Sequence, residues 1–228
     1  RHRMQRFEWD PSTVKVDWAL DGPVPWEGAP EALPGTVHIA DSLDQLSLTG
    51  GKVAAGLVPE RPFLLVGQMG VADPTRVPDG GEALWAYTHV PQRVRGDAAT
   101  EGDGLPRVRG TWDEADLEAM AERVEARIES RAPGFRDRIT ARRVLGPRQL
   151  ESMDRNLVGG AINGGTAGLH QQLVFRPVAG SGRAETPVRG LYLASASAHP
   201  GGGVHGACGA NAARAALWHH RIRTPWRR

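Results

Sequence analysis

The stretch HPGGGVHGACGANAARAAL, at His199–Leu217, places three consecutive glycines ahead of a long run of small side chains. Gly201, Gly203 and Gly206 have the spacing G-x-G-x-x-G, in which glycines let a backbone lie against a ligand without side-chain collision. The apolar run Gly190–Ala196 predicts a buried parallel strand before the glycines, and the alanines predict a helix after them. Backbone amides at the start of such a helix attract negative charge. The stretch therefore predicts a strand–turn–helix unit that receives the anionic end of a ligand.

A complete dinucleotide-binding unit needs more than this stretch supplies. A second strand should follow the helix and end, about 20 residues on, in an acidic residue that holds a ribose. No Asp or Glu occurs between Thr186 and Arg228, so that acidic residue is absent. The stretch is therefore expected to contact the charged end of a ligand but not a ribose. The alternative is that the small residues serve only to pack the helix closely on a sheet.

Alternating apolar and polar residues upstream predict half-buried strands of an antiparallel sheet. Strands are expected at Ser12–Leu20, Thr36–Ala40, Pro62–Met69 and Glu82–Val90, with a fifth in the segment RDRITARRVLG. One face of the strand Glu82–Val90 carries Trp85, Tyr87 and His89. These three side chains either pack in the core or line a substrate cavity.

Helical periodicity is strongest after Thr111, which has capping-box spacing to Glu114 and is followed by a single apolar stripe. A weaker helix is expected in DSLDQLSLTGGKVAAGL, interrupted at Gly50–Gly51. Glycine becomes frequent after about residue 153, which predicts a domain boundary there. Together these elements predict an α/β (α+β) fold with a mixed sheet and covering helices.

The totals restrict the partners and the compartment. The formal net charge of the 228 residues is +2, so composition requires no nucleic acid partner. The basic ends are compatible with contact to a membrane surface, and no apolar segment is long enough to span a membrane. The single cysteine, Cys208, fits a reducing, cytoplasmic compartment and is expected to be a small buried residue. His199 and His205 lack a third ligand, so no metal site is expected.

Several segments resemble the phytoene-desaturase-like FAD-dependent oxidoreductases, in the branch named pyridine nucleotide-disulphide oxidoreductase domain-containing proteins. They are KVDWALDGPVPW, RPFLLVGQ, DPTR, LWAYTHVP, NLVGGAINGG, LHQQLVFRP and GLYLASASAHPGGGVHGACGANAARAAL. The resemblance covers nearly the whole chain. It implies an amine-oxidase type of FAD fold, with a substrate-binding domain at residues 1–153 and the C-terminal strand–helix segment of a Rossmann-like FAD-binding domain at 154–228. The N-terminal dinucleotide-binding half is absent, so a missing N-terminal segment, in the same or a separate chain, is an expected partner.

The resemblance also implies where the cofactor lies. By it, Gly201, Gly202, Gly203, Val204 and His205 contact the isoalloxazine ring of FAD, and His205 either touches the flavin or relays a proton near it. The implied reaction transfers hydride or electrons to the flavin from a small, apolar substrate, with Trp85, Tyr87 and His89 as substrate-binding candidates. Many carotenoid desaturases resemble GGGVPG at this point, whereas this chain has His205, so a carotenoid substrate is not implied.

Other interpretations remain open from the sequence. The chain can be a non-catalytic remnant or binding module that holds no flavin, which the missing ADP site favours. Arg176, before Pro177, either pairs with a carboxylate at the domain junction or is structural. The loop around Asn163 contains Gly159, Gly160, Gly164 and Gly165, and such a loop needs unusual backbone angles.

Overall fold

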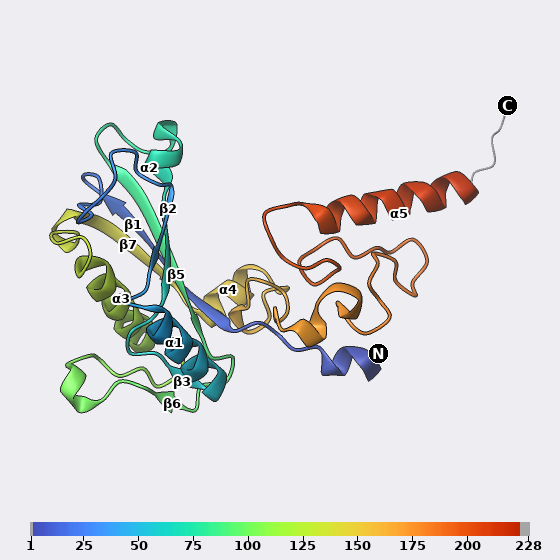
Figure 1. The fold of residues 1–228 in the computed structure, drawn as a ribbon, viewed down its shortest axis with the longest axis horizontal. Coiled ribbons are helices and arrows are strands. Elements are labelled where there is room, and N and C mark those ends of the chain that lie inside the picture. The colour runs from blue at the N-terminus through green and yellow to red at the C-terminus, as the bar shows by residue number, and fades with distance from the viewer. Residues whose placement is uncertain (1, 224–228) are drawn as a thin grey trace. The chain divides into compact units, whose positions relative to one another are not determined.

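The computed structural model describes residues 2–223, which form two compact units. The sheet unit comprises residues 11–155, and the loop unit comprises residues 2–10 and 156–223 (Figure 1). The last five residues of the basic C-terminal end, 224–228, lie outside the described residues. Whether the two units correspond to a substrate-binding domain and a segment of an FAD-binding domain stays a prediction.

The sheet unit is built on five antiparallel strands in the order β2-β4-β5-β1-β7. Their bounds are β1 Ser12–Leu20, β2 Thr36–Ile39, β4 Leu64–Gln68, β5 Glu82–Val90 and β7 Ile139–Leu145. A second, two-stranded parallel sheet joins β3 Leu57–Val58 to β6 Gly96–Asp97. The mixed α/β class and the strands expected from alternating side chains are confirmed, because a half-buried strand has a side-chain period of two.

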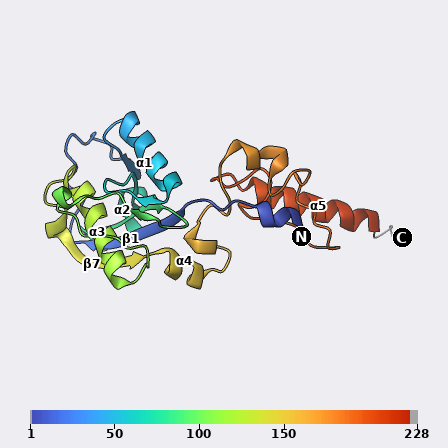
Figure 2. The same cartoon turned by 90° about the horizontal axis from the view of Figure 1, so that it is seen from below.

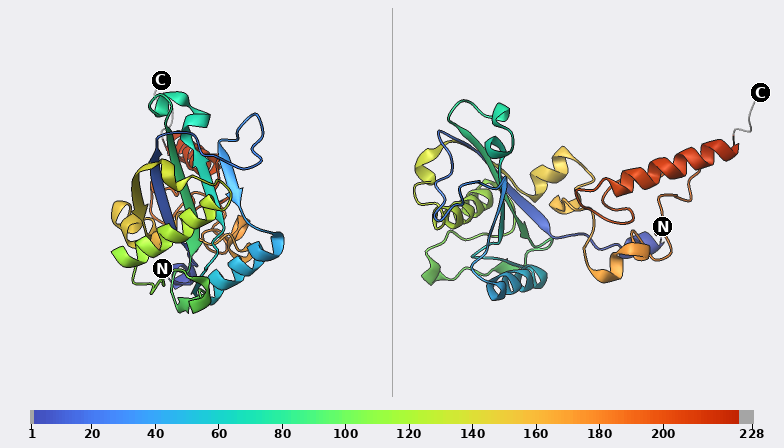
Figure 3. Two further views of the ribbon diagram at one scale, coloured as in Figure 1. Left: turned by 90° about the vertical axis from the view of Figure 1, so that its left-hand side faces the viewer. Right: turned by 45° about the horizontal axis from the view of Figure 1, so that its top comes forward.

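One face of the large sheet is covered by α3, Glu114–Glu129 (Figure 3, left). Apolar residues of α3, among them Val124 and Ile128, pack against Val16, Leu84 and other residues of the central strands. The expected capping box is wrong in detail. Asp113 caps the helix by accepting from the Asp116 amide, and the Thr111 hydroxyl donates to both carboxylates.

Three further helices lie in the sheet unit: α1 Leu43–Ala55, α2 Met69–Ala72 and α4 Pro147–Met153. The expected interruption of α1 at Gly50–Gly51 is wrong. Two interior glycines cost about 1 kcal/mol each but do not by themselves break a helix. Ser42 caps the N-terminal end, and Gly56, in the left-handed conformation, closes the C-terminal end.

The loop unit contains the long helix α5, Ala207–Arg223, and otherwise loops and short turns (Figure 2). The expected strand at Gly190–Ala196 is wrong: a single bridge joins Tyr192 to Glu185, and Leu191 is exposed. An apolar run becomes a strand only where neighbouring strands accept its backbone hydrogen bonds. Among the described residues of this unit, that bridge is the one such pairing.

Short 3-10 turns complete the fold in both units. They are His2–Arg6, Pro74–Arg76, Glu101–Asp103, Arg136–Arg138, Val158–Gly160, Leu169–Gln171 and Leu173–Phe175. Across residues 2–223, no helix combines the length and the apolar character needed to cross a bilayer.

Candidate functional site

The glycine loop, Gly201–Gly206, packs its inner side against its own chain. A Cβ on Gly202 would overlap the side-chain oxygen of Asn163, and one on Gly201 would lie 3.0 Å from Gln172 Oε1. The φ angles of Gly201, Gly203 and Gly206 are all positive, which favours glycine. Internal packing therefore explains part of the glycine pattern that the sequence assigned to a ligand.

The outer side of the same loop faces solvent. Val204 is fully exposed, and Gly202, Gly203 and Gly206 are exposed as well. A Cβ on Gly206 would find no atom of the described chain within 4 Å. The N-terminal end of α5 thus carries glycine backbone open to solvent, with the exposed side chains of Val204 and His205 projecting beside it.

His205 is fixed by the helix that it precedes. Its Nδ1 accepts a hydrogen bond from the Ala207 amide at 3.0 Å. The neutral ring therefore carries its proton on Nε2. Because the ring is exposed, this Nε2–H is available to a ligand.

Arg176 organises the loops behind the glycines. Its guanidinium is fully buried and donates hydrogen bonds to backbone carbonyls of Asn163, Gly165, Thr166, Gln171 and Ala196. Burial lowers the pKa of Arg176, while the charge of Asp10 opposes that shift. These contacts support the structural alternative for Arg176, because its hydrogen bonds go to carbonyls rather than to a carboxylate.

The other residues singled out in this unit have structural contacts. Cys208 is buried, as expected, and His199 Nδ1 lies 2.9 Å from the Leu173 carbonyl oxygen. The four glycines around Asn163 all have positive φ, as expected. Gln171 is a residue that the sequence did not single out: it is buried and bonds to the Glu8 backbone through both side-chain polar atoms. A 163-residue separation leaves no local signal for this pair.

A second candidate surface lies on the sheet unit, on the face of β5 opposite α3. Trp85, Tyr87 and His89 are half-buried there, as the alternation predicts. The rings of Trp85 and Tyr87 stack with centroids 5.9 Å apart, and those of Tyr87 and His89 meet edge to face at 5.7 Å. The Trp85 ring lies so close over Gly67 that a Cβ there would overlap it.

Polar groups flank this aromatic row. Thr13, on β1, pairs in register with His89. Thr13 Oγ1 and His89 Nδ1 are both buried and have no hydrogen-bond partner within the described part of the chain. Lys15 and Asp17, opposite Tyr87 and Trp85, form an ion pair. The surface therefore combines half-buried aromatic rings with an ion pair, and two buried polar atoms beneath it have no partner among the described residues.

No protein-family model matches the chain. A mouse protein (Mus musculus) named "Pyridine nucleotide-disulfide oxidoreductase domain-containing protein 2" is 31% identical over 223 residues, which cover 92% of this chain and 36% of that protein. The rat protein (Rattus norvegicus) of the same name matches with the same identity and coverage. The chain therefore spans about a third of the length of these relatives. Their names agree with the branch expected from sequence, and they mention neither a desaturase nor a flavin.

Among solved structures, a crystal structure of an oxidoreductase from Methanosarcina mazei aligns with 95% of this chain and 36% of its own. The TM-score is 0.47 at 17% identity, which is too low to establish a common fold. The roles of the glycine loop, His205 and the aromatic row stay predictions.

Proposed function

We propose that this chain is part of a FAD-dependent oxidoreductase, in which the glycine loop and the first turn of α5 lie against the isoalloxazine ring. The observation that carries the proposal is the exposed, glycine-rich loop Gly202–Gly206, at the start of a 17-residue helix. The sequence similarity to proteins named as oxidoreductase domain-containing supports it. When bound, the flavin would accept hydride or electrons from the substrate.

The residues present fit such a ring. A planar ligand can lie against exposed glycine backbone, which Gly202, Gly203 and Gly206 supply, with the side chains of Val204 and His205 beside it. The N-terminal end of α5 favours negative charge beside it by about 0.3–1 kcal/mol. His205 would present its Nε2 proton to an acceptor on the ligand, because Nδ1 is held by Ala207.

Exposed apolar side chains support a further partner for the loop unit. Among them are Leu169, Leu173, Val174, Phe175, Leu191, Val204, Leu217, Trp218 and Ile222. So much exposed apolar surface in a small unit is typical of a region that another segment covers. We propose that a dinucleotide-binding segment, in the same or a separate chain, packs here and holds the ADP half of FAD.

The substrate contact would lie on the sheet unit. Trp85 and Tyr87 offer stacked, half-buried rings to an apolar molecule. This favours a small, mainly apolar substrate. We propose that His205 is the candidate catalytic residue and that the aromatic row binds substrate.

The proposal is tested by comparing the FAD affinity of Val204→Glu with that of the unmodified chain. Quenching of flavin fluorescence measures the binding. Because Val204 is fully exposed, the change leaves the packing intact, and a carboxylate near the N-terminal end of α5 favours the helix. We expect the affinity for FAD to fall by roughly tenfold or more, equivalent to about 1.4 kcal/mol. The matched control is Val188→Glu, an exposed valine of the same unit that should leave binding unchanged. Equal affinity in the two variants would place the flavin elsewhere, and no binding by the unmodified chain at millimolar FAD would favour a binding module without flavin.

A further inference from the structure

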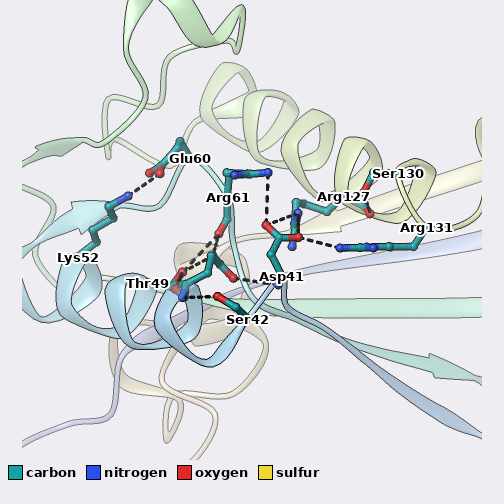
Figure 4. Close-up of polar contacts among 10 residues, drawn as sticks. Asp41, Ser42, Thr49, Lys52, Glu60, Arg61, Arg127, Ser130 and Arg131 are labelled. Carbon is teal, nitrogen blue, oxygen red and sulfur yellow. Dashed lines mark hydrogen bonds and ion pairs between the residues drawn. The ribbon is translucent and has the colours of Figure 1, made fainter.

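Three arginines converge on one carboxylate in the sheet unit, far in sequence from the glycine loop. Arg127 Nη1 donates to both oxygens of Asp41 at 3.0 and 3.2 Å, and Arg131 Nη2 donates to Oδ1 at 3.0 Å. Arg61 Nη2 lies 3.4 Å from Asp41 Oδ2 (Figure 4). Burial acts to raise the pKa of Asp41, but the three arginines outweigh it and hold the pKa below its ordinary value. Asp41 is therefore a permanent anion shared by three cations.

The neighbouring charged residues do not neutralise the excess of positive charge around Asp41. Arg123 pairs with the buried carboxylate of Asp97, and Glu60 pairs with Lys52. Arg61, Arg127 and Arg131 line one cavity, and Asp103 is the one further carboxylate that lines it. An oxygen of Asp103 accepts hydrogen bonds from the Thr100 amide and hydroxyl. The arginines outnumber the carboxylates left to them, so the cavity keeps a small net positive charge. A monoanion would neutralise that charge, whereas a dianion would exceed it.

Arg127 also has hydrogen-bond donors that Asp41 does not use. Its side chain is buried, yet Nε and Nη2 have no hydrogen-bond partner within residues 2–223. These two nitrogens form the side-on edge of a guanidinium, which binds both oxygens of a carboxylate in parallel. The edge is shielded from water, so a ligand reaches it only when neighbouring side chains move. Arg61 and Arg131, which line the same cavity, are more than half exposed and can change rotamer. A buried guanidinium edge without a partner is what a carboxylate ligand would satisfy.

The space around the cluster is large enough for more than a simple ion. Arg61, Arg127 and Arg131 line a cavity of about 500 Å³. Arg131 also lines a second cavity of about 520 Å³. Most of its wall is apolar, from Trp26, Leu33, Pro34, Val37 and Ile39, and the exposed Glu27 and His38 are its other polar side chains. A charged pocket and a mainly apolar pocket thus share one arginine, which is the arrangement that suits a molecule with an acidic head and an apolar body.

We propose that these two cavities bind an apolar organic monocarboxylate, with its carboxylate on Arg61, Arg127 and Arg131 and its body along the Trp26 side. The site shares no residue with the glycine loop or with the aromatic row. It does not depend on whether the chain binds a flavin.

Calorimetric titration of the full chain with decanoate tests the proposal, with acetate and decanol as probes that lack the body or the head. We expect decanoate to bind roughly tenfold or more tightly than either, since each lacks a contact worth about 1.4 kcal/mol. The double variant Arg61→Ala/Arg131→Ala should weaken decanoate binding by roughly tenfold or more, because two charge-assisted contacts are lost. Arg127→Lys should weaken it while keeping the charge, because a lysine has no two-donor edge.

The control is Arg148→Ala, which removes an exposed arginine of the same unit from outside both cavities. Arg61 and Arg131 are exposed, so their removal should leave the fold intact, which far-ultraviolet circular dichroism checks. The proposal is overturned if decanoate at about 5 mM shows no binding. That concentration is close to the weakest dissociation constant that the titration can measure. The proposal is equally overturned if acetate or decanol binds as tightly as decanoate, or if the double variant and Arg148→Ala bind decanoate alike. Decanoate that sticks only to the exposed apolar residues of the loop unit would give that last result.

Discussion

Gly202 lies against the side-chain amide of Asn163 so closely that a Cβ at position 202 would overlap the Asn163 oxygen. The φ angle of Gly202 is outside the left-handed region, so alanine is acceptable to the backbone there and the obstacle is steric. We expect Gly202→Ala to lower the stability of the loop unit by about 1–3 kcal/mol, the usual cost of overpacking. Hydrogen exchange of the loop-unit amides measures it.

The matched test of this contact is the double variant Gly202→Ala/Asn163→Ala, which removes the overlapping oxygen. We expect it to recover most of the lost protection, because the coupling of two residues in contact is measurable in a double-mutant cycle. If adding Asn163→Ala to Gly202→Ala does not restore amide protection, the contact between these two residues is not what requires glycine at position 202.

Arg176 should be essential to the loop unit and irrelevant to the sheet unit. Arg176→Met leaves several buried carbonyls without a hydrogen-bond donor. Each carbonyl that water cannot reach should lower the stability of the loop unit by about 1–3 kcal/mol. We expect loss of amide protection around residues 163–206 with unchanged protection in β1 and α3. Arg176→Lys should fail to rescue, since three donors from one nitrogen cannot replace the planar fork. Rescue by lysine would show that charge alone suffices.

The buried ion pair between Arg123 and Asp97 should hold the short β6 segment to α3. Both side chains are fully buried, with Nη2 and Oδ2 2.6 Å apart. Arg123→Met should lower the free energy of unfolding by about 3–5 kcal/mol, because it leaves a buried carboxylate unpaired. The double variant Arg123→Met/Asp97→Ala should lose less, in urea denaturation followed by circular dichroism. A larger loss in the double variant would contradict this account.

The same carboxylate should make stability depend on acid pH. Burial acts to raise the pKa of Asp97, but hydrogen bonds from Arg123, Val108 and Ala99 hold it below the ordinary value of 3.8. A lowered pKa in the folded state contributes stability that is complete above 3.8 and is lost as pH falls through the folded-state pKa. Asp97→Asn should therefore show a shallower loss of stability below about pH 4 than the unmodified chain. Identical pH profiles would remove Asp97 as a source of this dependence.

The sequence predicts best where one element carries its own pattern. The alternation in Ser12–Leu20 and Glu82–Val90 gave both strands with their bounds, because burial on one face of a sheet imposes a period of two. The alanine-rich segment likewise predicted α5. The strand at Gly190–Ala196 failed because an apolar run alone does not supply the neighbouring strands that it needs.

Contacts between distant residues were beyond sequence reasoning. Asp41 meets Arg127 and Arg131 across about 90 positions, and Arg131 lies just beyond the C-terminal end of α3, so no pattern within one element pointed to the pair. The contact of Gly202 with Asn163 is similar: the sequence predicted that backbone must come close to something there, but not that the partner was the chain itself.

The most direct test of the central claim is a nuclear magnetic resonance titration of the ¹⁵N-labelled chain with FAD. Even a weak, incomplete site shifts the amides that the ring contacts, so this measurement does not require the ADP half to be held. The account predicts shift changes concentrated at Gly201–Gly206 and the first turn of α5, reduced in Val204→Glu and retained in Val188→Glu. Saturating FAD that leaves these amides unchanged, or that shifts a different surface, would contradict it.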